Sequence, residues 1–102
     1  MFCMIKGKIA GVKHFDASIF VRIKIDNKTK KRYTQFRQKL SNKYKVSKYG
    51  NEGFTKLLGN GIDINIFKGE KYLHVVVYGK NRKNVLGILM ENFEFLEYKT
   101  NS

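Results

Sequence analysis

Apolar and polar residues alternate most regularly in residues 18–26. Every second position carries a branched apolar side chain, at Ile19, Val21, Ile23 and Ile25. The positions between them are Phe20, Arg22 and Lys24. A period of two residues is typical of a β-strand that is buried on one face only. The pattern therefore predicts a strand with one packed face and one face open to solvent or to a partner.

A helical pattern follows this strand. Tyr33, Phe36 and Leu40 are three or four residues apart, which places them on one side of a helix. The basic residues 28–32 are predicted to lead into that helix, and residues 41–42 to end it. Residues 44–46 then predict a short edge strand, and the glycine-containing residues 50–53 predict a joint between two halves of the chain.

The second half is built around residues 72–78, which are apolar on both faces of an extended chain. Such a segment predicts a central strand that is covered on both sides. The elements predicted around it are a strand over residues 62–66, a hairpin turn over 68–71, a helix over 84–90 and the beginning of a strand over 93–95.

The two halves match at an offset of fifty-three residues. Residues 19–37 fall on residues 72–90 with the same order of strand, basic turn and helix, and residues 4–9 fall on 57–62. At 102 residues the chain is predicted to be one domain. We expect it to contain two strand–strand–helix repeats, about 1–50 and about 54–100, related by a pseudo-twofold axis. This arrangement predicts an α+β fold with an antiparallel sheet and two helices.

Charge distinguishes the two halves. The net charge of the chain is +13, and residues 1–52 hold fourteen Lys and Arg against three Asp and Glu. Such a charge favours polyanions or an acidic protein partner. A nucleic-acid interface in the first half is therefore one hypothesis, and a solvated basic surface is the other. The residues predicted for that interface are Arg22, Lys24, Lys28, Lys30, Lys31, Arg32 and Arg37.

Candidates for catalysis or metal binding are few. His14 is expected at the surface, His74 packed on a strand and Cys3 in the core, and none has a metal-ligand spacing. We therefore predict no catalytic residue, no metal site and no cofactor, and expect a protein that is not an enzyme. The lone cysteine and the short apolar N-terminus predict a soluble, intracellular protein that does not interact with membranes.

A second binding hypothesis uses apolar residues. The cleft between two repeats and an open strand edge both suit an extended protein or peptide segment, which can add to the sheet as another strand. The apolar residues near the C-terminus exceed what one helix face can bury, so they need the other repeat, a second copy or a foreign segment. The residues predicted for this contact are Phe20, Tyr72, Phe93 and Phe95.

The length, the MFCMIKGKIAG start, the two-unit pattern and the bias toward Lys, Asn and Ile resemble small proteins of the Acidianus filamentous viruses. These are lipothrixviruses that infect hyperthermophilic archaea. The resemblance covers the full chain and rests on no functional motif. It implies a viral protein in the host cytoplasm, with a place in the virion left open. Small non-enzymatic proteins commonly bind host or viral partners in that setting.

Overall fold

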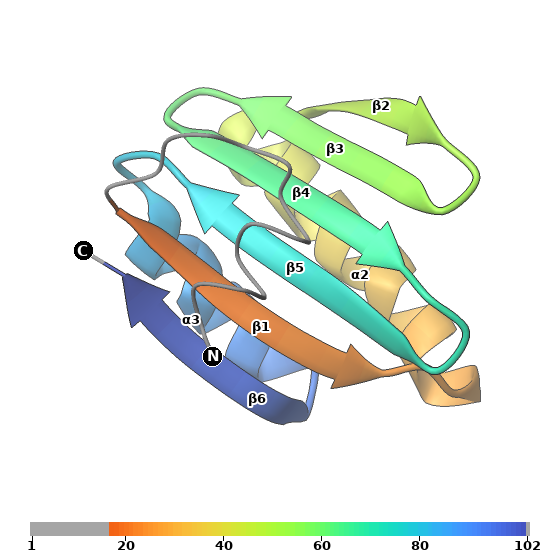
Figure 1. Cartoon of the computed structure of the whole chain (residues 1–102). Coiled ribbons are helices and arrows are strands. Elements are labelled where there is room, and N and C mark those ends of the chain that lie inside the picture. The colour runs from red at the N-terminus through yellow and green to blue at the C-terminus, as the bar shows by residue number, and fades with distance from the viewer. Residues whose placement is uncertain (1–16, 102) are drawn as a thin grey trace.

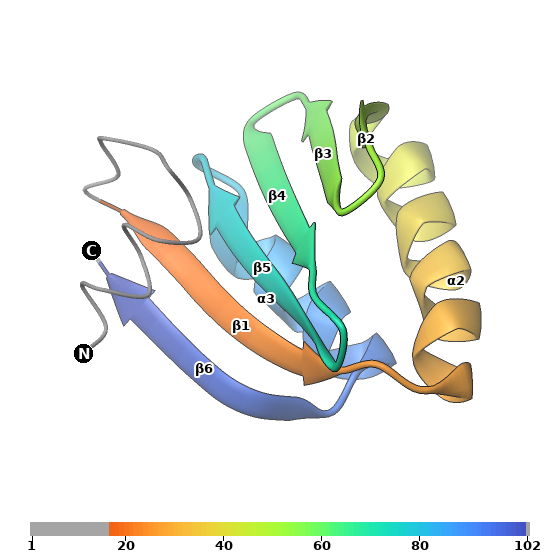
Figure 2. The same cartoon turned by 45° about the vertical axis from the view of Figure 1, so that its right-hand side comes forward.

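The computed structural model describes residues 17–101, which form a six-stranded antiparallel sheet and two α-helices. The sheet order is β2-β3-β4-β5-β1-β6, and both helices lie on the same face of the sheet (Figures 1 and 2). The predicted α+β class, with an antiparallel sheet and two helices, is confirmed. The elements in chain order are β1 (Ser18–Lys24), α2 (Asn27–Tyr44), β2 (Ser47–Asn51), β3 (Phe54–Gly59), β4 (Ile62–Lys68), β5 (Tyr72–Tyr78), α3 (Arg82–Asn92) and β6 (Phe95–Asn101).

The core lies between the sheet and the two helices. Its strand residues come from alternate positions, as in Val21 of β1 and Ile64 of β4, and its helix residues include Phe36 and Leu89. All four side chains are almost completely buried. The alternation in residues 18–26 correctly predicts the core face of β1, but Phe20 on the other face is also buried. The strand ends at Lys24 because the chain must leave the sheet there to begin α2.

The prediction of a central strand over residues 72–78 is also confirmed. β5 pairs with β4 on one side and with β1 on the other. Val75, Val76 and Val77 are all buried, although consecutive strand residues point to opposite faces. A segment with this pattern is stable only in the interior of a sheet.

Helix α2 is longer at both ends than its apolar spacing predicts. It begins at Asn27 because the Asp26 carboxylate caps it, accepting the Thr29 backbone N–H at 2.8 Å. It continues beyond residues 41–42 to Tyr44, whose side chain is buried. Lys45, in the left-handed conformation at φ 53°, ends it. The predicted edge strand over residues 44–46 is therefore wrong, and the edge strand begins at Ser47.

Residues 50–53 were predicted to join two halves of the chain, and the structure has a turn there. They belong to the tight hairpin between β2 and β3, with Glu52 and Gly53 as turn residues. The predicted strand over residues 62–66 and the predicted turn over 68–71 match β4 and the turn that follows it. α3 contains the predicted helix 84–90. Phe93 lies between this helix and β6, which begins only at Phe95.

The twofold relation between two repeats is not confirmed. β1 and β5 are antiparallel neighbours, and each is followed by a helix and then a strand. The strands after the two helices take different positions, however. β6 pairs directly with β1, whereas β2 lies at the other edge of the sheet. The predicted strand that begins at residue 4 lies outside the described residues.

A groove between α2 and the β2 edge

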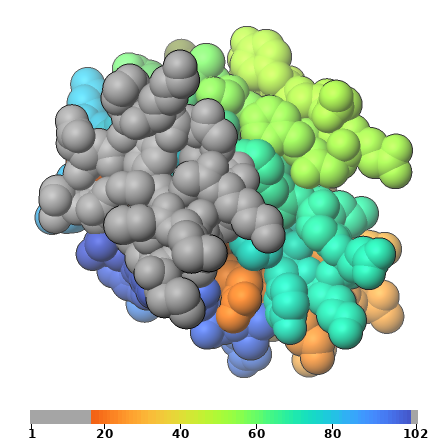
Figure 3. All heavy atoms as spheres, in the orientation of Figure 1, coloured from red at the N-terminus to blue at the C-terminus, as the bar shows by residue number. Residues whose placement is uncertain are grey.

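The edge strand β2 leaves one side of its backbone open. It pairs with β3 alone among the described strands, and all five of its residues are exposed. The β2–β3 hairpin lies at the outer rim of the molecule, at the upper right of Figure 3. Alternate N–H and C=O groups of an edge strand point outward, where another extended chain can pair with them. β2 is therefore a possible template for an added strand.

Helix α2 runs beside this edge (Figure 2). Residues of both elements line a hollow. The hollow has a volume of about 450 Å³. Lys48 of β2 pairs with Leu57 of β3, so both side chains belong to the face of the sheet that α2 covers. The hollow is lined by Thr34, Arg37, Gln38, Ser41 and Asn42 of α2, by Val46 and Lys48, and by Leu57.

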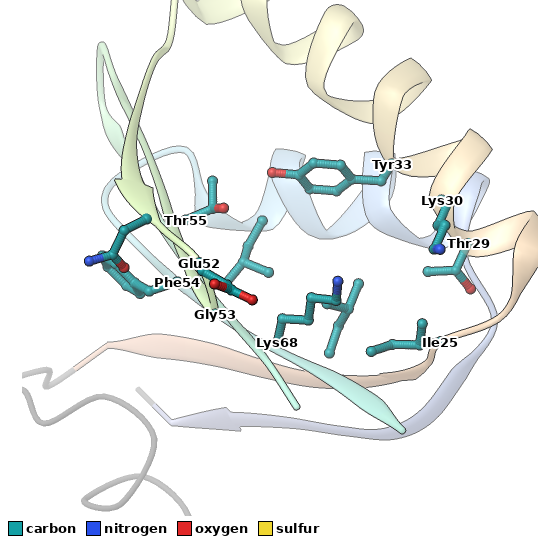
Figure 4. Close-up of a pocket in the computed structure, with 12 residues that line it drawn as sticks. Ile25, Thr29, Lys30, Tyr33, Glu52, Gly53, Phe54, Thr55 and Lys68 are labelled. Atoms are coloured by element: carbon teal, nitrogen blue, oxygen red, sulfur yellow. The ribbon is translucent and has the colours of Figure 1, made fainter. Parts of the chain in front are cut away.

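A second hollow of about 310 Å³ follows the first one along the same flank of α2, toward the start of the helix. We call it the Tyr33 pocket, and the two hollows together the α2–β2 groove. The walls of the Tyr33 pocket are mostly apolar, and the pocket lies between α2 and the β2–β3 turn (Figure 4). It is lined by Ile25, Thr29, Lys30 and Tyr33, by residues 51–55 of the β2–β3 hairpin, and by Ile66, Lys68 and Leu73.

The polar rim of the groove is mainly cationic. Lys30 and Lys68 line the Tyr33 pocket, and Arg37 and Lys48 line the larger hollow. None of the four forms an ion pair with a described residue. Glu52 is the single carboxylate among the lining residues. Unpaired cations beside a partly enclosed apolar surface favour an anionic occupant.

Tyr33 forms one wall of its pocket and keeps its hydroxyl proton. Burial raises the pKa of Tyr33 above its ordinary value, while the Thr55 hydroxyl and the charge of Arg37 act in the opposite direction. The Tyr33 hydroxyl points toward β3, where Thr55 lies (Figure 4). It is buried without a well-formed hydrogen bond to any described residue. A neutral ring therefore contributes apolar surface to the pocket.

The structure divides the predicted basic interface. Lys30 and Arg37 line the α2–β2 groove. Lys28 and Arg32 lie on the other flank of α2, beside Glu94, and Lys31 is exposed between the two flanks. Acidic residues near α3 partly offset the positive charge of that other flank. There the Lys39 ammonium lies 2.8 Å from the Glu91 carboxylate. The basic residues of α2 therefore form two rows and not one stripe.

Lys24, at the end of β1, lines a hollow together with Lys28 and Arg32, so it lies beside one of the two rows. Arg22 belongs to neither row, because it alternates with the core residues of β1 and lies on the sheet face opposite the helices. The Arg22 guanidinium lies 3.7 Å from the Glu97 carboxylate and 5.1 Å from the centre of the Tyr72 ring. The sheet therefore separates Arg22 from the basic helix.

The apolar residues predicted for partner binding are also dispersed. Phe93 is buried against Phe36, with ring centroids 5.6 Å apart, and Phe95 packs beside the same core. Phe20 is buried and Tyr72 half-buried on the opposite sheet face. These four residues do not line one groove. The groove that the structure contains uses Tyr33, expected in the core, and β2, which is too polar to predict as a strand.

Of the three candidates for catalysis, only His74 lies within the described residues. His74 is half-buried, and its ring lies 5.9 Å from that of Phe20. Within residues 17–101, no three His, Cys, Asp or Glu side chains are placed to hold a metal ion. Cys3 and His14 lie outside the described residues. No helix in the described part of the chain is both long and apolar enough to cross a membrane.

Comparison with known proteins assigns no family. No family model and no curated protein matches the chain. Among solved structures, it is similar to the NMR structure of PA4090 from Pseudomonas aeruginosa, with a TM-score of 0.46 and 11% identity. That match covers 84% of this chain and 95% of the other. The function is therefore argued from the residues of this chain.

Proposed function

We propose that this protein is a non-enzymatic interaction module that binds an extended segment of a partner protein in the α2–β2 groove. The observation that carries the proposal is the position of β2. β2 is an exposed edge strand, and no described strand pairs with the outer side of its backbone. It lies next to a hollow that α2 lines. A segment that pairs with β2 gains backbone hydrogen bonds, while its alternate side chains enter the hollow.

Charge determines the kind of segment. The groove presents Lys30, Arg37, Lys48 and Lys68 against the single carboxylate of Glu52. A segment that alternates acidic and apolar residues matches both the cationic rim and the apolar floor. Electrostatic attraction by a protein with a net charge of +13 also speeds the encounter with an acidic partner.

The setting belongs to the same proposal. On the resemblance to proteins of archaeal filamentous viruses, we propose that the module acts in an infected host cell and that its partner is a host or viral protein. The β1–α2 and β5–α3 units are proposed to derive from one repeated unit that took different strand positions. A second copy of the chain is a further possible partner, because its own edge strand could pair with β2.

The test begins with a random nonapeptide library that is displayed with free C-termini and selected on the immobilised full chain. Enriched peptides are synthesised and titrated by fluorescence anisotropy, and their contact surface is mapped by amide chemical shifts. We expect acidic–apolar sequences, and the largest shifts in β2 and along the groove-facing flank of α2. Shifts confined to β6 or to the opposite sheet face would contradict the proposal, as would failure to enrich any peptide.

Matched variants separate the groove from general attraction. Arg37→Glu with Lys48→Glu reverses two cations in the groove, and we expect binding to weaken roughly tenfold, or about 1.4 kcal/mol. Lys31→Glu with Lys71→Glu makes the same change in net charge at two exposed lysines away from the groove. This control should bind within about twofold of wild type. Equal losses of peptide affinity in the two double variants would show that only the overall charge of the protein attracts the peptide.

A nucleic-acid-binding function is the second candidate, and it is favoured by the composition of α2. The helix has eighteen residues and no Asp or Glu. Lys28, Lys31 and Arg32 are exposed outside the groove. A row of cations of this kind attracts phosphates by releasing counterions.

The two candidates respond to different changes. Duplex DNA, single-stranded DNA and RNA are titrated at low and near-physiological salt. Binding that persists at the higher salt and is lost after reversal of Lys28, Lys31 and Arg32 would support the second candidate. The same triple variant should keep its affinity for peptides. Binding to nucleic acid only at low salt would exclude this function.

A further inference from the structure

We infer that the Tyr33 pocket receives the C-terminal residue of the bound segment, whose apolar side chain fills the cavity and whose free carboxylate lies between Lys30 and Lys68. This inference rests on the proposed function, because it concerns the end of the segment that pairs with β2. It identifies a terminus, a chain direction and a kind of residue.

The position and the charge of the pocket together give the direction. β2 runs from Ser47, beside the larger hollow, to Asn51, which lines the Tyr33 pocket. The β2–β3 turn follows, and the Gly53 carbonyl accepts the Lys68 backbone N–H at 2.9 Å, which fixes this turn against the end of β4. A segment that runs parallel to β2 reaches the pocket with its C-terminal residue, and an antiparallel segment would reach it with its amino terminus. Lys30 and Lys68 favour the end that carries the carboxylate, and so the parallel direction.

The walls of the pocket suit an apolar side chain. Ile25, Tyr33, Ile66 and Leu73 provide hydrophobic surface from four different elements or connections. Ile66 and Leu73 also belong to the core, so the pocket floor is rigid. Its volume of about 310 Å³ falls within the size range of small ligand sites.

The charges of the pocket suit one carboxylate. Lys30 on α2 and Lys68 at the end of β4 extend their ammonium groups into the same space, between Tyr33 and Ile25 (Figure 4). Neither ammonium forms an ion pair with a described residue. The N-terminus of α2 is already capped by Asp26, so the two lysines provide the positive charge.

A C-terminal residue carries both required groups on one Cα atom. Its side chain can enter the apolar cavity while its carboxylate stays at the cationic mouth. An internal Asp or Glu would instead place a carboxylate in the apolar cavity, where an unpaired charge is unfavourable. The larger hollow lies farther along the same flank of α2, so the residue in the pocket can belong to a longer segment that follows β2.

The experiment compares one selected peptide in three forms: with a free C-terminal carboxylate, with a C-terminal amide, and with one glycine added after its last residue. We expect the free acid to bind roughly tenfold more tightly than the amide. We expect the extended peptide to bind weakly as well, because its apolar residue is no longer terminal. Lys30→Met with Lys68→Met should reduce the preference for the acid to within about twofold.

Controls make the possible failures distinguishable. Lys31→Met with Lys71→Met removes the same charge elsewhere and should keep the preference for the acid. If acid and amide bind equally and both shift the amides of β2, the inference is wrong and the proposed function stands. If neither form shifts β2, the proposed function fails and the inference fails with it. An acid preference that survives the Lys30 and Lys68 changes would also overturn the inference.

Discussion

Thr29 joins the end of β1 to the beginning of α2. Its hydroxyl lies 2.7 Å from the Lys24 carbonyl and 2.9 Å from the Asp26 carboxylate, so its single hydrogen can be donated to either oxygen. The Thr29 backbone N–H and hydroxyl both bond to Asp26 and lower the pKa of that carboxyl group. One buried residue thereby determines where α2 begins, and with it the position of Lys30 and Tyr33 in the groove.

Replacing Thr29 with valine tests this connection. Valine keeps the shape but leaves the Lys24 carbonyl without its hydroxyl donor. We expect the free energy of unfolding to fall by about 1–2 kcal/mol, measured by urea denaturation. Thr34→Val is the control, since the exposed Thr34 hydroxyl makes one long bond of 3.5 Å to Lys30. Equal losses in the two variants would contradict this role.

The buried Tyr78 hydroxyl is expected to make the protein less stable at alkaline pH. Burial and the charge of Asp63, its cross-strand neighbour, raise the pKa of Tyr78 to about 12 from an ordinary 10.0. Between these two values the unfolded chain loses the phenolic proton while the folded chain keeps it, so unfolding becomes more favourable as pH rises. Stability should therefore decline above about pH 10.

The matched variant is Tyr78→Phe, which has no proton to lose. Thermal unfolding followed by circular dichroism from pH 9 to 12 should show a smaller decline for this variant than for wild type. The same decline in both proteins would mean that lysine deprotonation and other tyrosines dominate in this range.

At the scale of elements, apolar periodicity in the sequence identifies the strands and helices that pack in the core and misses a strand that stays exposed. β1 and β4 were predictable because their core-facing residues alternate, β5 because it is apolar on both faces, and both helices because their core residues recur every three or four positions. β2 has the sequence Ser-Lys-Tyr-Gly-Asn and buries none of these residues. β2 pairs with β3 because a short hairpin connects them, not because it buries apolar side chains. Its sequence therefore has no apolar pattern that predicts a strand.

Two glycines around α3 have opposite roles. Gly87 is exposed within the helix, and an added methyl group would meet nothing within 4 Å. We expect Gly87→Ala to stabilise the protein by about 1 kcal/mol and to raise the urea midpoint without changing the slope. A lower midpoint would show that α3 is strained there.

Gly79 provides the contrast at the turn that leads into α3. Its φ of +108° suits glycine, and an added Cβ would lie 2.5 Å from the Gly61 carbonyl oxygen. Gly79→Ala should therefore lower the same midpoint. The β3–β4 turn and the β5–α3 turn are thus packed backbone to backbone.

At the scale of the whole molecule, the net charge of +13 acts against compact folding. Described ion pairs are few, and the cations of the groove have none. Salt shortens the range of charge repulsion from about 30 Å at 0.01 M to about 8 Å at 0.15 M. The melting temperature should therefore rise by a few degrees between these two sodium chloride concentrations.

A variant with less positive charge checks this explanation. Lys31→Glu with Lys71→Glu changes two exposed side chains and should raise the melting temperature at low salt, with a smaller gain at high salt. A melting temperature that does not depend on salt would show that repulsion contributes little. Scanning calorimetry of both proteins at the two salt concentrations provides the measurement.

The sequence alone determined the α+β class, the core faces of β1, β4 and β5, and the presence of two helices, since burial imposes a local period on each. It also placed Lys30 and Arg37 in a basic segment. It did not determine which strands form the edges or how α2 divides its cations, because strand order and helix rotation depend on contacts between distant residues. The α2–β2 groove therefore exists only in the tertiary structure, where a polar strand and one flank of a helix come together.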